Sequence, residues 1–178
     1  MRVHVFGASG SGTTTFGRGL ASHWSIPHHD TDDYYWKKTL EPFTEKRPVE
    51  DRIQLMKASF LETPSWVLSG SLVSWSKTII PYFDLAIFLS LDNSERLKRI
   101  KLREVARYGE GALAPNGNRY KAYQDFMEWN SGYENSNFKG RSRRLHEAWI
   151  KKLSCPVIRL DSKNTISELI RATELELS

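Results

Sequence analysis

Short runs of apolar residues recur along the chain and alternate with stretches of helical periodicity. The run Val3–Phe6 ends at Gly7, and the run Trp66–Ser69 ends at Gly70. Apolar strands that alternate with helices are typical of a parallel sheet covered on both faces. The pattern therefore predicts an α/β fold with strands at residues 3–6, 66–69, 85–89 and 156–160, and a fifth strand near residues 26–29.

Apolar residues at helical spacing mark the elements between these strands. Phe16, Leu20 and Trp24 fall at i, i+4 and i+8, so they form one stripe of a helix that begins near Thr13. A second helix is expected to begin at Pro48, because proline is favoured in a first helical turn. Two more helices are predicted, one capped by Asp92 or Asn93 and running through residues 95–105, the other over residues 166–177.

The segment between Gly109 and Gly140 differs from the rest of the chain in composition. It is polar, punctuated by glycine, and rich in aromatic residues. An insertion of this kind before the last strand favours a mobile lid, which we place at residues 108–140. A partly ordered surface excursion is the alternative. The aromatic residues of the segment are Tyr120, Tyr123, Phe126, Trp129, Tyr133 and Phe138.

The composition of the 178 residues, with 39% hydrophobic and 26% charged, is ordinary for one globular domain. No run approaches the roughly 20 apolar residues of a membrane span, and the first residues lack the apolar core of a signal peptide. The one cysteine, Cys155, excludes an intramolecular disulfide framework. We therefore expect a single domain over residues 1–178, cytoplasmic, without a membrane partner, as a monomer or homodimer.

A glycine-rich run follows the first predicted strand directly and precedes the first predicted helix. It matches the phosphate-binding pattern G-x-x-x-x-G-K-[ST] except that Thr13 stands where the pattern has lysine. The run predicts a loop whose N–H groups bind the phosphates of ATP, with the Thr14 hydroxyl on Mg²⁺. A functionless strand-to-helix turn is the alternative. The residues expected to contact the nucleotide are Gly7, Ala8, Ser9, Gly10, Ser11, Gly12, Thr13, Thr14 and Thr15.

The missing lysine means that another cation must neutralise the transferred phosphoryl group, or that turnover is low. Arg99, Arg103 and Arg107 lie four residues apart, so they share one helix face just before the predicted lid. Arg141 lies at the far end of the lid, followed by Arg143 and Arg144. Guanidinium groups suit phosphate oxygens. We expect catalytic roles for Arg103, Arg107 and Arg141; a solvated helix face is the alternative.

An acidic cluster, Asp30-Thr-Asp32-Asp33, ends the probable second strand. Alternating residues of an extended chain point the same way, so Asp30 and Asp32 are expected to face one site. A carboxylate there can orient an acceptor hydroxyl or accept its proton. The alternative is a helix cap with a turn, and Asp33 resembles the cap. Asp32 is the predicted catalytic carboxylate.

Other residues near this edge of the sheet are expected to contact an acceptor, within an acceptor-binding region over residues 33–62. Arg47 offers a cation for a phosphate or a carboxylate, although a surface role is equally compatible with its position. Gly70 and Ser71 end the third strand, where a small residue lets a substrate approach closely. Adjacent His28 and His29 point to opposite faces of a strand, so they are not expected to share a metal ion.

Together these residues resemble the P-loop kinases of nucleotides and small molecules, the group that holds adenylate, cytidylate and shikimate kinases. Asp30-Thr-Asp32 looks like the D-[ST]-D of shikimate kinases, in which the second carboxylate holds the acceptor hydroxyl and the first lies near the metal. Gly12-Thr-Thr-Thr15 is similar to loops of some archaeal nucleotide kinases that lack the lysine. The chain departs from adenylate and shikimate kinases where the third strand ends in Ser-Gly-Ser.

The resemblance implies a five-stranded parallel sheet in the order 2-3-1-4-5 and transfer of the γ-phosphoryl group of Mg-ATP to a small acceptor. The acceptor it implies is a nucleoside monophosphate or a hydroxylated metabolite. The rival hypothesis is a nucleotide-binding regulator with little turnover, in contact with nucleic acid through a surface of net charge +5. Carboxylates at a strand end repel a phosphate backbone, so nucleic acid is the less favoured partner.

Overall fold

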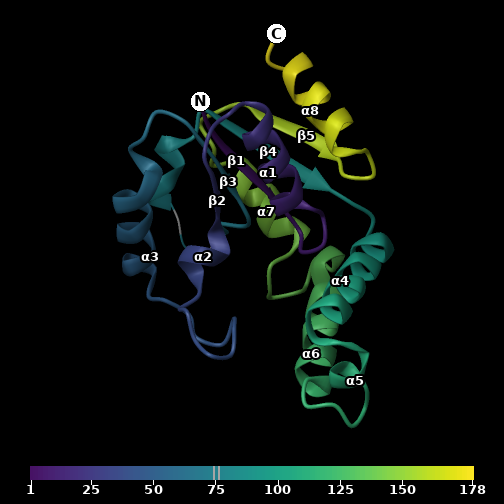
Figure 1. Cartoon of the computed structure of the whole chain (residues 1–178). Coiled ribbons are helices and arrows are strands. Elements are labelled where there is room, and N and C mark those ends of the chain that lie inside the picture. Colours follow the sequence, from purple (N-terminus) through teal and green to yellow (C-terminus); the bar gives the residue numbers. More distant parts are fainter. Residues whose placement is uncertain (74, 76) are drawn as a thin grey trace.

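The computed structural model describes residues 1–73, 75 and 77–178 and contains a five-stranded parallel sheet in the order β2-β3-β1-β4-β5 (Figure 1). This order confirms the one that the resemblance implied. The strands lie close to the predicted apolar runs, which therefore located the sheet. They are β1 (Arg2–Gly7), β2 (His28–Asp30), β3 (Trp66–Ser69), β4 (Leu85–Ser90) and β5 (Val157–Asp161).

The first strand lies at the centre of the sheet. Val5 pairs with Ser69 of β3 on one side, and Gly7 pairs with Leu89 of β4 on the other. The segment that leaves β1 therefore emerges between two strands at their carboxyl ends, where ligands of doubly wound sheets bind.

The helices connect these strands and cover both faces of the sheet. The regular helices are α1 (Thr13–His23), α2 (Thr31–Tyr35), α3 (Val49–Met56), α4 (Asn93–Tyr108), α5 (Glu110–Leu113), α6 (Tyr120–Ser131), α7 (Arg143–Ile150) and α8 (Ile166–Leu175). Helices α1, α3, α4 and α8 agree with the predicted periodicity, whereas α2, α5, α6 and α7 were not predicted. Shorter turns are a π-helical one at Lys57–Leu61 and 3-10 turns at Lys77–Tyr82 and Gly132–Glu134.

Two separate cores form because successive side chains of a strand point to opposite faces. Val3 and Val5 pack with α1 and α8 in one core, which also contains Leu20 and Leu169. Phe6 packs in the other core with residues of α3 and α7. Figure 1 shows α1 and α7 on opposite sides of the sheet. In the part of the chain that the structure describes, no helix is both long and apolar enough to cross a membrane.

The predicted lid segment is helical. Helices α4, α5 and α6 form an arm that extends beyond the sheet (Figure 1). Leu113 and Asn130 of the arm are buried, as is Tyr133 of the turn that follows it. The glycines and polar residues of this segment therefore separate short helices. Movement of the arm as a lid stays a prediction.

Two histidines are fully buried in the core beside the third strand. His4 stacks on Phe6, and its Nε2 lies 2.9 Å from the carbonyl oxygen of Gly70. His146 lies between Ser71 and Tyr133: its Nε2 is 3.0 Å from the Ser71 hydroxyl, and its Nδ1 is 2.7 Å from the Tyr133 hydroxyl. Burial lowers the pKa of His4 to about 4 and the pKa of His146 to about 3.

We expect the free energy of unfolding to fall as the pH drops below about 6.5, the usual pKa of a histidine in an unfolded chain. Between that value and the pKa values of the folded state, the unfolded chain binds protons that buried His4 and His146 do not bind. Each histidine then lowers the free energy of unfolding by up to about 1.4 kcal/mol per pH unit. Urea unfolding at several pH values measures the slope. His146→Gln should reduce it, whereas His23→Gln, at an exposed position, is the matched control; equal slopes in both variants would contradict the prediction.

Candidate functional site

The glycine-rich run forms a closed loop between β1 and α1. Ser11 donates hydrogen bonds to the carbonyl oxygen of Ala8 from both its backbone N–H, at 3.1 Å, and its hydroxyl, at 2.8 Å. Gly10 and Gly12 have φ values of 80° and 85°, in the left-handed region that favours glycine. Helix α1 begins directly after this loop, so its N–H groups and the positive end of its dipole face the space above the loop.

Tight packing holds this loop in place. A Cβ at Gly7 would lie 2.4 Å from the carbonyl oxygen of Leu89, and a Cβ at Gly10 would lie 2.6 Å from the carbonyl oxygen of Arg96. The loop is therefore pressed against both β4 and α4. This arrangement fixes the loop from behind while its open side remains able to accept an anion.

A chain of hydrogen bonds joins the loop to the acidic cluster. The Thr14 hydroxyl donates to Oδ2 of Asp30 at 2.7 Å, and the Ser69 hydroxyl lies 3.2 Å from the same oxygen. Oδ1 of Asp30 accepts the backbone N–H of Asp32 at 3.0 Å. Asp30 is thus the N-cap of α2. The expectation that Asp33 is the cap was wrong, because the strand ends at Asp30 and the helix starts one residue later.

The Thr14 hydroxyl and the Asp30 carboxylate suit a magnesium ion chemically. Magnesium prefers oxygen ligands, and at phosphate sites it is usually held by one or two protein oxygens together with phosphate oxygens and water. Among the described residues, no group of three or more histidine, cysteine, aspartate or glutamate side chains is arranged to hold a metal by itself. A nucleotide would therefore have to complete such a site.

Replacing Thr14 with alanine is expected to weaken Mg-ATP binding by about 10- to 100-fold, the usual cost of removing a group that supports a metal. The reason is loss of the hydroxyl that lies 2.7 Å from Asp30. Calorimetric titration with and without Mg²⁺ measures the effect, which should disappear without the metal. Thr14→Ser keeps the hydroxyl and is the matched control. Equal Mg-ATP affinities for the alanine and serine variants would contradict the assignment.

Asp32 lies in the first turn of α2, solvent-exposed but surrounded by protein on several sides. Desolvation and the charge of Asp30 raise the pKa of Asp32, while the positive charges of Arg141 and Arg103 oppose the rise. The charges of both arginines therefore act on Asp32. We call the region around Asp32, Arg103 and Arg141 the recess. Asp30 and Asp32 are joined through the helix cap and not through the strand alternation that we expected, because Asp32 is already helical. That both carboxylates face one acceptor site stays a prediction.

Arg141 precedes α7 and approaches the same recess. Its guanidinium lies 5.2 Å from the ring centroid of Trp129. Burial lowers the pKa of Arg141, and the negative charge of Asp32 opposes that change. No carboxylate of the described residues lies within 4.0 Å of this guanidinium. Arg141 is thus a cation whose charge acts on Asp32 and which forms no direct ion pair among the described residues.

The other predicted arginines differ in the residues that they contact. Arg103 lies 3.2 Å from a carboxylate oxygen of Glu104, and Arg107 lies 3.9 Å from the same oxygen. Arg107 also lies 5.0 Å from the ring centroid of Phe43. Only Arg103 of this pair affects the pKa of Asp32. Arg143 forms an ion pair with Glu134 instead of facing the recess.

Three residues predicted to contact an acceptor are engaged within the fold. Nη1 of Arg47 donates to the carbonyl oxygen of Tyr34 at 2.8 Å. The space beside Gly70 is filled by Thr31, whose hydroxyl oxygen lies where a Cβ would be placed. Ser71 contacts buried His146. A small residue at position 70 is therefore needed for the packing of Thr31, and not, as we expected, for the approach of a substrate. Contacts of Arg47, Gly70 and Ser71 with an acceptor stay predictions.

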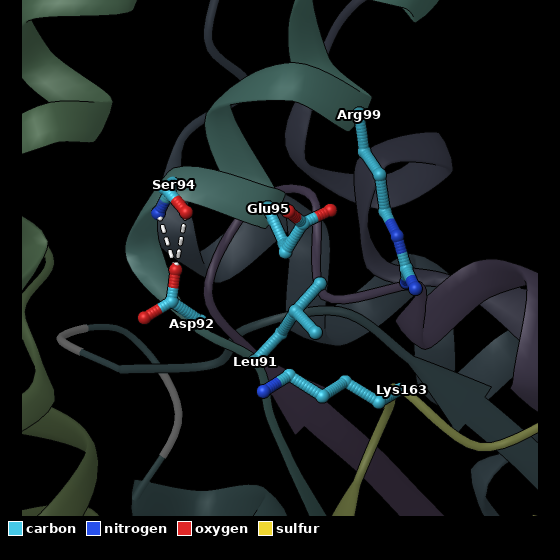
Figure 2. Close-up of a pocket in the computed structure, with 6 residues that line it drawn as sticks. All are labelled: Leu91, Asp92, Ser94, Glu95, Arg99 and Lys163. Atoms are coloured by element: carbon cyan, nitrogen blue, oxygen red, sulfur yellow. Dashed lines mark hydrogen bonds between the residues drawn. The ribbon is translucent and has the colours of Figure 1, made fainter.

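A second recess, of about 480 Å³, lies beside α4 and the segment that follows β5. Arg99 donates to the hydroxyl and carbonyl oxygens of Ser162 at 3.2 and 3.0 Å, and its Nη1 is 3.7 Å from the position of a Cβ at Gly12. Figure 2 shows that Arg99 points from α4 toward the segment that carries Lys163. The recess therefore opens next to the phosphate-binding loop. Its lining residues are Leu91, Asp92, Ser94, Glu95, Arg99 and Lys163.

Two buried arginines were not predicted. Arg52 lies 3.9 Å from the ring centroid of Tyr35 and 5.0 Å from that of Trp75. Arg96 of α4 is 1% exposed. The signal for Arg96 was present in the sequence, since it precedes apolar Ile100 by one helical turn and so lies on the inward face.

The comparisons with solved structures identify the fold. The chain is similar to the shikimate kinase of Bacteroides thetaiotaomicron, with a TM-score of 0.63 and 16% identity over 99% of this chain and 98% of the other. It is also similar to the shikimate kinase of Aquifex aeolicus, with a TM-score of 0.57 and 16% identity over 99% of this chain and 96% of the other. At this identity the likeness establishes a P-loop kinase fold.

A comparison with the sequences of known proteins finds a similar protein. No family model matches the chain. The chain is 39% identical over 168 residues to the uncharacterized protein YqaC of Bacillus subtilis (strain 168), a match that covers 94% of this chain and 92% of YqaC. The chain therefore belongs to the same family as YqaC, and its sheet carries the P-loop kinase fold.

Proposed function

We propose that the protein is a kinase that transfers the γ-phosphoryl group of ATP to a small, negatively charged acceptor. The observation that carries the proposal is the hydrogen-bonded chain from Thr14 through Asp30 to Asp32. It joins the phosphate-binding loop to Asp32, whose charge interacts with that of Arg141. A donor phosphate and an acceptor bound at the two ends of this chain would be close together.

The donor nucleotide would occupy the loop and the recess beside α4. The N–H groups of the loop and the start of α1 would bind the phosphates. The recess lined by Arg99 and Lys163 would take the remainder of the nucleotide, since Arg99 lies beside Gly12. Magnesium, when bound at Thr14 and Asp30, neutralises charge on the phosphate oxygens.

The acceptor would occupy the recess of Asp32 and Arg141. The acceptor oxygen forms a bond to the γ-phosphorus, the bond from that phosphorus to the β–γ bridging oxygen breaks, and Asp32 accepts the proton of an acceptor hydroxyl. Its raised pKa favours this role, because a base works best when its pKa approaches the working pH. Arg141 would bind a phosphate or carboxylate of the acceptor. Both a nucleoside monophosphate and a hydroxylated acid meet these requirements.

Arginines of the arm would complete the site on closure. Arg103 already lies near Asp32, whereas Arg107 contacts Phe43 and Glu104. Movement of the arm would exchange these contacts for contacts with the transferred phosphoryl group. Exclusion of water by such a movement strengthens the electrostatic interactions that stabilise a transition state.

The second candidate is a nucleotide-binding regulator with little turnover, and Thr13 is the observation that favours it. Threonine can donate a hydrogen bond but cannot neutralise charge. A regulator would bind nucleotide with no need of Asp32 and Arg141, which is why the kinase is preferred. The regulator predicts strong binding of ATP with the same slow hydrolysis for every added compound.

The experiment that tests the proposal measures release of ADP from Mg-ATP across nucleosides, nucleoside monophosphates, shikimate and sugar acids. We expect one class of acceptor to raise the rate well above the rate without acceptor. Binding of ATP without any acceptor-dependent release would favour the regulator. Absence of ATP binding would overturn both candidates.

A further inference from the structure

Arg96 is a buried cation with no carboxylate partner within 4.0 Å among the described residues. Its side chain lies on the inward face of α4, and Nε has no hydrogen-bond partner within the part of the chain that the structure describes. Burial lowers the pKa of Arg96, but a guanidinium stays protonated in proteins. Burial of an unpaired charge is costly, so a residue of this kind needs a reason beyond packing.

The contacts of Arg96 connect the phosphate-binding loop to the arm. Nη1 donates to the carbonyl oxygen of Ser9 at 2.9 Å. Nη2 donates to the side-chain oxygen of Asn93 and to the carbonyl oxygen of Asn130, the latter at 3.4 Å. The ring of Tyr133 faces the guanidinium, with its centroid 4.7 Å away. Ser9 belongs to the loop, whereas Asn130 and Tyr133 belong to the C-terminal part of the predicted lid segment.

The position of this charge has an electrostatic consequence. The guanidinium contacts the loop at the carbonyl oxygen of Ser9, whereas the phosphates are expected at the N–H groups of the loop. It lies within a protein interior where charges are weakly screened. The loop carries threonine at position 13, where the phosphate-binding pattern has lysine. A fixed positive charge behind Ser9 therefore makes the loop more attractive to an anion without a cation inside the loop itself.

We propose that Arg96 is a positioning residue that fixes the phosphate-binding loop against the arm and supplies, from behind Ser9, positive charge in place of the absent lysine. The proposal rests on the proposed nucleotide-binding function of the loop. It assigns to one side chain both the attraction of the phosphates and the link between the loop and α6. The role is indirect, because Arg96 reaches the nucleotide only through the loop backbone.

The test compares Arg96→Met, Arg96→Lys and Thr13→Lys, singly and in combination, by calorimetric titration of Mg-ATP and by kcat and KM. We expect Arg96→Met to weaken Mg-ATP binding by about 10- to 100-fold, the effect of removing one nearby charge in a weakly screened interior. Arg96→Lys should retain most of the affinity but lose kcat, because lysine keeps the charge without the fork that contacts both Ser9 and Asn130. Arg171→Met, at an exposed position on α8, is the matched control for loss of one charge.

The decisive variant carries both Arg96→Met and Thr13→Lys. If Arg96 supplies the missing charge, lysine at position 13 should restore affinity for Mg-ATP in the Arg96→Met background by more than it changes the wild-type protein. An equal effect of Thr13→Lys in the two backgrounds would overturn the proposal. So would wild-type affinity in Arg96→Met.

The melting temperature of each variant shows whether a loss of affinity comes from misfolding, and the affinity of the wild-type protein for Mg-ATP tests the proposed function itself. Should Arg96→Met fail to fold, the same comparison is made with Arg96→Lys alone and with Thr13→Lys. Loss of affinity in Arg96→Lys as large as tenfold, with an unchanged melting temperature, would then overturn the electrostatic role. Failure of the wild-type protein to bind Mg-ATP would contradict the proposed function itself, whereas normal binding with insensitive variants would contradict only the role of Arg96.

Discussion

Replacing Asp32 with asparagine is expected to lower kcat for the acceptor-dependent reaction by about 100- to 10,000-fold, the usual contribution of a general base. Asparagine has nearly the same shape but cannot accept the proton of an acceptor hydroxyl. It also removes the negative charge that opposes the burial-driven fall in the pKa of Arg141. Initial rates of ADP release at saturating Mg-ATP measure the change, together with the affinity for Mg-ATP, which should stay close to that of the wild type.

Asp33→Asn is the matched control for this prediction, because Asp33 is the exposed neighbour of Asp32 in the same helix. It removes the same charge one residue farther along and should leave kcat within about threefold of the wild type. Comparable rates for the Asp32 and Asp33 variants would mean that Asp32 is not the base. A loss caused by unfolding would appear in the melting temperature, which neither substitution should lower greatly.

Replacing Arg141 with glutamine is expected to lower kcat/KM for the acceptor by about 100- to 1,000-fold, the size of effect seen when one preorganised donor is removed from a charged transition state. Arg141 is directed at the recess of Asp32 and lies over the ring of Trp129 without a carboxylate within 4.0 Å among the residues that the structure describes. Arg141→Lys keeps the charge but not the two parallel donors, so it should recover only part of the loss.

The two predictions are coupled, and their combination distinguishes a shared site from two separate ones. Asp32 and Arg141 influence each other's pKa, so both substitutions in one protein should cost less than the product of their separate effects. Steady-state kinetics of the double variant give the coupling. Strict multiplication of the two effects would place the side chains in independent roles and contradict the common recess.

The sequence predicted the phosphate-binding side of the site well, because that side is formed by local structure. The apolar run of β1, the glycines that follow it and the stripe of α1 are contiguous, so their order alone places the loop at the carboxyl end of a central strand. The helix cap at Asp30 was missed by a few residues. The expected alternation assumed an extended chain as far as Asp32, whereas the strand already ends at Asp30.

The contacts between distant segments were harder to predict. The role of Arg96 was missed because it depends on hydrogen bonds to Ser9 and Asn130, which are far from Arg96 in sequence and near it only after folding. Arg107 shares a helix face with Arg103, but its contacts in the structure are with Phe43 and Glu104. The periodicity of a sequence predicts which residues share one face of a helix, but it does not predict which other segments that face contacts in the folded protein.

The helical arm shows the same limit. Glycine, proline and polar residues between the fourth strand and the last one predicted a lid without predicting its helices, and the structure has short helices there. Their stability comes from tertiary contacts such as the burial of Tyr133 and the position of Arg96 over its ring. Local propensity is a weak guide where packing of this kind decides the conformation.

The most direct test of the account follows the γ-phosphoryl group itself. The protein is incubated with Mg-ATP labelled in the γ-phosphate and with the acceptor that stimulates ADP release, and the labelled products are separated. We expect the label to enter a new phosphorylated acceptor, in amounts equal to the ADP formed, and Asp32→Asn to abolish this transfer while ATP still binds. Label that remains in ATP, or that appears only as inorganic phosphate at the same rate in both proteins, would contradict phosphoryl transfer to an acceptor.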